Sequence, residues 1–139
     1  MLFALGRLLT LTVIKSFATA IVSLATQGSR ILVGDMQESV FFVAYKAPEN
    51  RLLVFADDSQ SRWITAQTMV DYTTVAAGDR FGNIFVSRLD MKVSDQVDDD
   101  PTGAGILHEK GILMGAPHKT QMLAHLHVGN LINNLYSES

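Results

Sequence analysis

The sequence predicts an all-β protein: antiparallel four-stranded sheets stacked as consecutive blades of a WD40-like β-propeller. The chain reads as short apolar runs joined by turns of hairpin length, and some of these runs are apolar on both faces. A Gly-Asp hairpin at Gly34-Asp35 recurs 44 residues later at Gly78-Asp79. That spacing lies within the roughly 40 to 45 residues of a four-stranded propeller blade. About two blades are therefore expected.

The first blade is predicted at about residues 20–58. Its strands are expected at 21–25, 30–34, 39–45 and 51–56, each rich in β-branched or aromatic residues and followed by a turn signal. The segment 47–50 is one such turn, because Pro48 presets φ and Asn50 tolerates a left-handed conformation. Connections this short join antiparallel strands.

The strand at 39–45 indicates how the sheets are arranged. Val40 and Phe42 point to one side, and Phe41 and Val43 point to the other, so both faces are apolar. An antiparallel sheet with one face in water would alternate apolar and polar residues. Because no 3.6-residue apolar period is long enough to predict a packed helix, a second sheet is expected to cover the first.

The second blade is predicted at about residues 61–128, with strands at 63–71, 73–77, 83–89 and 120–128. An acidic insertion, 90–119, separates its third and fourth strands. Because the first half of this insertion holds several aspartates, few large apolar residues and a Pro-Thr-Gly turn, we expect a solvated, mobile loop. Residues 130–139 are interpreted as a divergent tail.

Composition excludes several classes of function. The net charge is −3, and all 14 acids follow residue 34, so no basic surface for a phosphate backbone is expected. The absence of cysteine excludes disulfides and thiolate metal sites. The N-terminal 25 residues could be a targeting segment cleaved near Ala18-Thr19-Ala20, but strands at 8–14 and 20–25 are favoured. Arg7 and Lys15 interrupt any apolar run of bilayer length, so no membrane span is expected.

Candidate ligand groups are present but poorly spaced. Asp98-Asp99-Asp100 offers the carboxylates that Ca²⁺ or Mg²⁺ prefers, yet it lacks the alternating ligands and glycine bend of a calcium loop. His125 and His127 would share a strand face, with His108 and His118 nearby in sequence, but the strand supplies no third or fourth zinc ligand. No metal site is predicted.

Catalytic patterns are equally incomplete. Ser61, His118 and Asp79 could be combined into a hydrolase triad, but no Gly-x-Ser-x-Gly elbow orders them. The run 103–105, Gly-Ala-Gly, lacks the third glycine and the helix of a phosphate cradle. Trp63, beside Arg62, is expected in the core, with an interface anchor as the alternative. No catalytic or cofactor-binding residue is predicted, and Asp35 and Asp79 are interpreted as turn residues.

Several segments in order resemble a known family of propeller scaffolds. They are Arg30–Ser39, Phe55-Ala56-Asp57-Asp58 with Arg62-Trp63, Phe81-Gly82-Asn83, Asp99–Gly103, Gly115–Lys119 and His127-Val128-Gly129. The family includes subunit 3 of splicing factor 3b, the A subunit of the cleavage-and-polyadenylation specificity factor and the damaged-DNA-binding adaptor of ubiquitin ligases. The Phe-Ala-Asp-Asp, Asp-Pro-Thr-Gly and Gly-Ala-Pro segments are similar to its splicing branch.

The resemblance implies part of the third of three seven-bladed propellers. It implies a nuclear, non-catalytic scaffold that holds protein subunits of the splicing factor 3b complex, notably a helical-repeat subunit, during branch-site recognition. It implies no catalysis, no cofactor and no metal, and the lack of a basic surface argues against direct contact with nucleic acid. The alternatives are an adaptor or polyadenylation propeller of the same family, or a small organelle-targeted enzyme that uses His118, His125 or His127.

Two blades alone should leave an apolar sheet face open on each side of the stack. Repeat folds usually need about three units to bury their faces. Exposed apolar patches of several hundred Å² mark partners or aggregation. We therefore expect the isolated chain to self-associate through its uncovered blade faces or to fold poorly.

Overall fold

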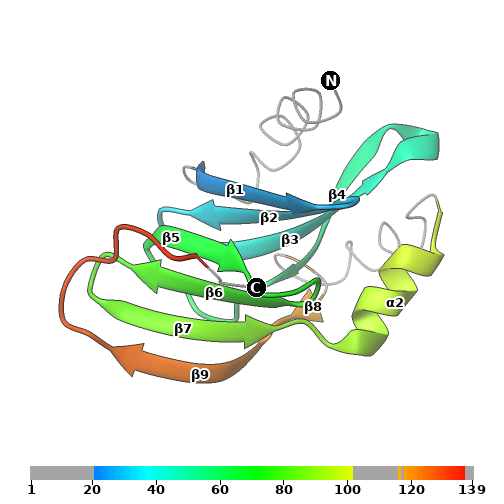
Figure 1. Ribbon diagram of the computed structural model, residues 1–139. Helices are drawn as coiled ribbons and strands as arrows, with labels where there is room; N and C mark the ends of the chain where they lie inside the picture. The colour runs from blue at the N-terminus through cyan, green and yellow to red at the C-terminus, as the bar shows by residue number, and fades with distance from the viewer. Residues whose placement is uncertain (1–20, 102–115, 117, 137–139) are drawn as a thin grey trace.

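The computed structural model describes residues 21–101, 116 and 118–136, which form two stacked sheets with one short α-helix at an end of the stack (Figure 1). The strand order is β1-β2-β3-β4-β8 in the first sheet and β5-β6-β7-β9 in the second. Each sheet is built on a four-stranded antiparallel meander. The all-β, propeller-blade fold class predicted from sequence is confirmed.

The first sheet contains β1 (Ile21–Gln27), β2 (Arg30–Asp35), β3 (Ser39–Lys46) and β4 (Arg51–Asp57). The 3-10 turn η2 (Ala47–Glu49) joins β3 to β4 and ends at Asn50, whose φ of 45° is the left-handed conformation expected there. A short strand, β8 (His118–Lys119), pairs with β4 in parallel. Lys119 Nζ also donates to Asp57 Oδ1 at 2.5 Å, so the end of the insertion is fastened to the edge of the first sheet.

The second sheet contains β5 (Ile64–Met69), β6 (Thr74–Asp79), β7 (Asn83–Arg88) and β9 (Gln121–His127), all paired antiparallel. Its first strand, β5, lies beside β1 and β2, and its last strand, β9, is an outer edge (Figure 1). No helix among the described residues is both long enough and apolar enough to cross a bilayer.

Both faces of the first sheet are buried along β2 and β3. One face packs on the second sheet through a shared core that includes Leu32, Phe42, Phe55, Ile64, Val75 and Phe85. On the other face Val33, Phe41 and Val54 are at most 2% exposed. Ala116, from the returning end of the insertion, packs in this second cluster. The expectation of an uncovered face on this side is therefore wrong.

The far face of the second sheet is more open. Ile84 lies directly opposite Leu126 in the β7–β9 pair, and both point away from the shared core that holds Phe85. Leu126 is 62% exposed. On this side the expected apolar face is accessible at Leu126 of β9, whereas Ile132 covers it at Gly78 of β6.

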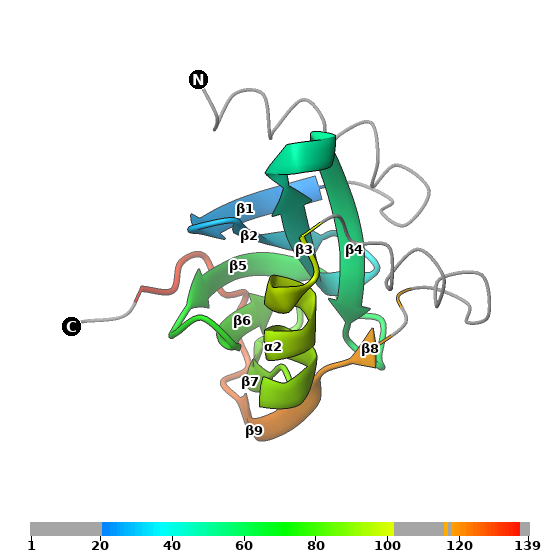
Figure 2. The same cartoon turned by 90° about the vertical axis from the view of Figure 1, so that its right-hand side faces the viewer.

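The first half of the insertion is a helix, α2 (Met91–Asp99), and the expectation of a mobile loop there is wrong. Asp90 caps the helix, because its carboxylate accepts from the Lys92 N–H at 2.8 Å. Val93 and Val97, four residues apart, pack on the shared core, and Val97 is 2% exposed. Figure 2 shows α2 lying across the ends of both sheets.

The segment after β9 continues the pattern set by the two blades. A Cβ on Gly34 of β2 would lie 2.8 Å from the Gln67 side chain of β5, the first strand of the following blade. A Cβ on Gly78 of β6, at the equivalent repeat position, would lie 2.4 Å from the side chain of Ile132. Ile132 therefore occupies, over the second sheet, the place that Gln67 occupies over the first.

Candidate functional site

The layer between the two sheets, called here the seam, has two different ends. At the first end lie the β2–β3 turn, the β6–β7 turn and the linker 58–63 that joins β4 to β5. At the second end lies α2, which contacts the start of β2, the end of β3 and the β5–β6 turn.

The hairpin aspartates shape the first end. Asp35 Oδ1 accepts from the backbone N–H groups of Gln37 and Glu38, each at 2.8 Å. Asp79 Oδ1 accepts from the N–H groups of Phe81 and Asn83 at 2.9 Å, and its Oδ2 accepts from the Asn83 amide at 2.9 Å. Because these carboxylates are buried and hold their own turns, the prediction that they are turn residues is confirmed.

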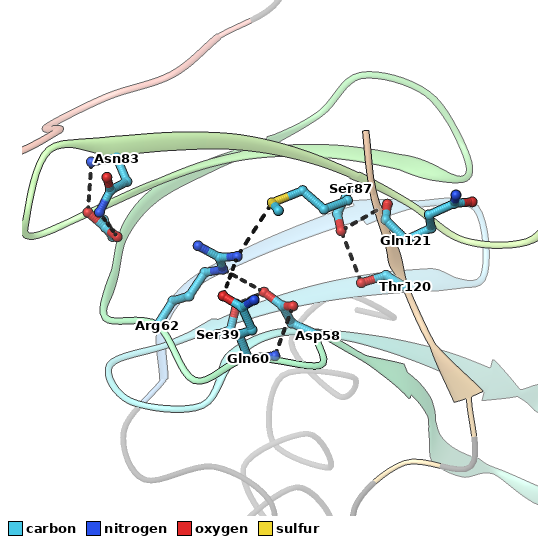
Figure 3. Close-up of polar contacts among 10 residues, drawn as sticks. Ser39, Asp58, Gln60, Arg62, Asn83, Ser87, Thr120 and Gln121 are labelled. Atoms are coloured by element: carbon cyan, nitrogen blue, oxygen red, sulfur yellow. Dashed lines mark hydrogen bonds and ion pairs between the residues drawn. The ribbon is translucent and has the colours of Figure 1, made fainter. Parts of the chain in front are cut away.

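A polar clamp holds the linker against the first sheet (Figure 3). Asp58 Oδ2 accepts from the Ser39 hydroxyl at 2.7 Å and from Arg62 Nε at 2.9 Å. The Ser39 N–H donates to the Arg62 carbonyl at 3.1 Å. The Arg62 guanidinium then reaches into the seam and lies 4.3 Å from the centroid of the Phe85 ring. This clamp joins the two sheets through a charged group that is only 9% exposed.

A cleft of about 380 Å³ opens at the first end of the seam. Its lining comes from the two turns and the linker: Met36, Gln37, Ser61, Arg62, Trp63, Asp79, Phe81 and Asn83. Trp63 is half-buried, not a core residue as expected, because it lies just before β5, where Arg80 stacks on its ring at 4.7 Å. Phe81 is 65% exposed.

At the second end, Arg30 anchors α2. Its side chain is fully buried and donates to the Tyr72 carbonyl at 3.1 Å, the Ser94 hydroxyl at 2.7 Å and Asp98 Oδ1 at 3.0 Å. The guanidinium also stacks on the Tyr72 ring at 3.9 Å. Lys46 donates to the Val97 carbonyl near the helix C-terminus, where a cation is favoured.

Two groups in the β5–β6 turn have shifted pKa values. The Thr73 backbone N–H donates to Asp71 and, as the largest effect, lowers the pKa of that carboxyl. Burial raises the pKa of the Tyr72 hydroxyl, although the charge of Arg30 opposes the shift. Asp71 holds its own turn, and Tyr72 contacts Asp98 of α2 and the Arg30 guanidinium.

The structure does not assemble the candidate chemical sites. Ser61 and Asp79 both line the cleft, but His118 lies on β8 at the edge of the first sheet. His125 and His127 are exposed on β9, and His127 Nδ1 lies 2.9 Å from Asn83 Oδ1. Among the described residues no three His, Asp or Glu side chains gather as a metal site.

The aspartate run has a structural role instead. Asp98 pairs with Arg30, which sequence reasoning did not single out. The run 103–105, His108 and the N-terminal segment lie outside the described residues. The linker clamp was also missed, although its acid and base, Asp58 and Arg62, are spaced four residues apart in the sequence.

Comparison with known proteins gives a consistent result. Residues 2–138 match the family model described as the CPSF A subunit region. The chain is 58% identical over 122 residues to pre-mRNA-splicing factor RSE1 of Mycosarcoma maydis, covering 88% of the chain. It is 48% identical over 125 residues to a probable splicing factor 3B subunit 3 of Dictyostelium discoideum, a match that covers 90% of the chain. It is 46% identical over 121 residues to splicing factor 3B subunit 3 of Drosophila melanogaster, a match that covers 87% of the chain. The chain spans about 10% of the length of each relative.

Proposed function

The chain belongs to the family of the CPSF A subunit region, and we propose that it is a non-catalytic scaffold segment of a splicing factor 3b complex acting in pre-mRNA splicing. The observation that carries this proposal is the 58% identity to a pre-mRNA-splicing factor over 88% of the chain. The relatives named above are a pre-mRNA-splicing factor and two splicing factor 3B subunits by name. Their splicing role favours this proposal over a ubiquitin-ligase adaptor or a polyadenylation factor.

The architecture supports a scaffold. The two described sheets, β1-β2-β3-β4-β8 and β5-β6-β7-β9, support two blades at about 20–58 and 61–128, and Ile132 lies on the far side of the second sheet as Gln67 lies on the first. We place these blades in the third of three propellers of a longer protein. The accessible face around Leu126 would then pack on further sheet, and the other surfaces would hold protein subunits such as a helical-repeat subunit during branch-site recognition.

The site geometry supports a non-catalytic role. The carboxylates of Asp35 and Asp79 are already occupied by turn N–H groups, so neither is available as a general base. Asp58 is held by Ser39 and Arg62. The nuclear location and the protein partners follow from the splicing role and are part of the same proposal.

Co-purification tests the proposal. The tagged full chain is expressed in cells, and the proteins recovered from the nuclear fraction are quantified by mass spectrometry against a tag-only control. We expect enrichment of splicing factor 3b subunits, above all the helical-repeat subunit. Recovery of ubiquitin-ligase or polyadenylation subunits in their place would favour the rival scaffolds, and a mature N-terminus near Ala20 with no splicing subunits would favour the small organelle-targeted enzyme.

A further inference from the structure

The cleft at the first end of the seam has the composition of a protein-binding pocket. Met36, Trp63 and Phe81 supply its apolar surface, and each comes from a different connection between strands. Tryptophan, arginine, methionine and phenylalanine are enriched where proteins bind one another. At about 380 Å³ the cleft has room for one or two apolar side chains of a partner.

The acidic side chains around the cleft already have hydrogen-bond partners, whereas a nearby arginine has no acidic partner. Both oxygens of Asp79 accept turn hydrogen bonds, and both oxygens of Asp58 accept from neighbours, including the Gln60 N–H at 3.1 Å. Arg80 is exposed and stacks on Trp63, and within the described part of the chain its guanidinium makes no ion pair or side-chain hydrogen bond. A cation is therefore held on the ring of the lining residue Trp63, with no carboxylate partner among the described residues.

Arg62 adds a second donor. Its Nε binds Asp58, and its Nη2 contacts Gln60 and the sulfur of Met122, at 3.0 and 3.5 Å. Its Nη1 donates no hydrogen bond to the described residues. Figure 3 shows this guanidinium between the linker and the second sheet, with Asp58 and Gln60 on its linker side. Glu38, the exposed acid of the β2–β3 turn, lies outside the lining.

We propose that this cleft binds an acidic, hydrophobic segment of a partner protein. An apolar side chain of the segment lies between Met36, Trp63 and Phe81, and a neighbouring carboxylate pairs with Arg80 and Arg62. Charge complementarity selects this occupant, because Arg62 in the lining and Arg80 on the Trp63 ring offer cationic donors, whereas Asp79 in the lining and Asp58 beside it are already occupied. The inference depends on the geometry of the cleft alone and does not require the chain to enter a splicing complex.

Trp63 makes a direct test possible, because it is the only tryptophan in the chain and it lines the cleft. The full chain is titrated with a capped peptide in which leucine and phenylalanine are flanked by glutamates. The same peptide with lysines in place of the glutamates is the comparison. We expect a saturable change in Trp63 fluorescence with the acidic peptide, at least about tenfold weaker binding of the basic one, and weaker acidic binding at high salt.

Single substitutions test whether the acidic peptide binds at the cleft. Arg80→Gln and Phe81→Ser should each weaken the acidic peptide about fivefold, measured by calorimetry because either change can alter the Trp63 emission itself. Lys92→Gln removes an exposed cation at the other end of the seam and should leave affinity within about twofold. Arg80 and Phe81 are exposed, so the variants should melt at the wild-type temperature.

Three results would overturn the inference. They are the absence of saturable binding up to millimolar peptide, equal affinity for the acidic and basic peptides, and unchanged affinity in both cleft variants. If a variant fails to melt cooperatively, amide shifts of Met36 and Phe81 in the wild-type chain decide the location: the acidic peptide must move them more than the amides of α2.

Discussion

Replacing Asp98 with alanine should loosen α2 from the two blades and destabilise the chain. The change removes the carboxylate that faces Arg30, whose side chain has no exposed surface, while Asp98 itself is 39% exposed. An exposed ion pair contributes up to about 1 kcal/mol. Breaking a fully buried pair costs about 3 to 5 kcal/mol. Because only one partner is buried here, we expect a loss of about 2 kcal/mol in the free energy of unfolding.

Urea unfolding followed by Trp63 fluorescence measures this loss. With a slope of about 2 kcal/mol per molar urea, the midpoint should fall by about 1 M. Asp95→Ala is the matched control: it removes an exposed acid from the same helix, with the same gain in helix propensity, and should shift stability by no more than about 0.5 kcal/mol. The double variant Arg30→Met with Asp98→Ala should be no less stable than Arg30→Met alone, because the buried charge is then gone. Equal midpoints for Asp98→Ala and Asp95→Ala would refute the anchoring role of the pair.

Three further changes test other parts of the fold. Gly78→Ala places a Cβ 2.4 Å from the Ile132 side chain, so it should lower the free energy of unfolding, measured by thermal denaturation, by about 1 to 3 kcal/mol. Adding Ile132→Ala to this variant should restore part of the lost stability. If Gly78→Ala melts at the wild-type temperature, the close packing is contradicted. Leu126→Lys alters a side chain that is 62% exposed, so stability should stay within about 0.5 kcal/mol, and a loss above about 1 kcal/mol would show that this face is covered. The pKa of Asp71 is lowered by the Thr73 N–H, so its contribution to stability is fully present above the unfolded pKa near 3.8 and is lost as pH falls through the lower folded value. Asp71→Asn should therefore be less stable than wild type at pH 6 and converge with it in acid; a constant difference in urea midpoint across that range would contradict this.

The strands were predictable because hairpins carry local signals. Turn chemistry at Gly34-Asp35, at 47–50 and at Gly78-Asp79 set the limits of neighbouring strands, and the two-faced apolar pattern of β3 required a second sheet. The predicted strands at 83–89 and 120–128 agree with β7 and β9 to within a residue or two. Short-range rules were sufficient wherever adjacent strands pair with each other.

The helix was not predictable by the same rules. Only Val93 and Val97 form its apolar stripe, which is too short to show a 3.6-residue period beside a run of aspartates. Its position depends on Arg30, which is distant in sequence. The outer cluster of the first sheet also contains a residue distant in sequence, because Ala116 packs there with side chains of β2, β3 and β4.

Two residues of the cleft were singled out from the sequence, but the cleft itself was not predicted. Sequence reasoning singled out Trp63 and Arg62 but favoured the core for the tryptophan, because a lone tryptophan in a strand is usually buried. Its partial exposure results from the position of the linker just before β5 and from the β6–β7 turn that brings Arg80 onto the ring. No spacing rule connects Met36, Trp63 and Phe81, since they meet only when two blades stack.

A segment exchange tests the scaffold role most directly. In Mycosarcoma maydis, the 122-residue region of pre-mRNA-splicing factor RSE1 that matches this chain is replaced by the corresponding residues of the chain, and intron retention is measured across the transcriptome. If the chain is a working propeller segment of a splicing scaffold, the chimera should accumulate to normal levels and splice introns as the parent does. Normal accumulation of the chimera together with widespread intron retention would contradict that role.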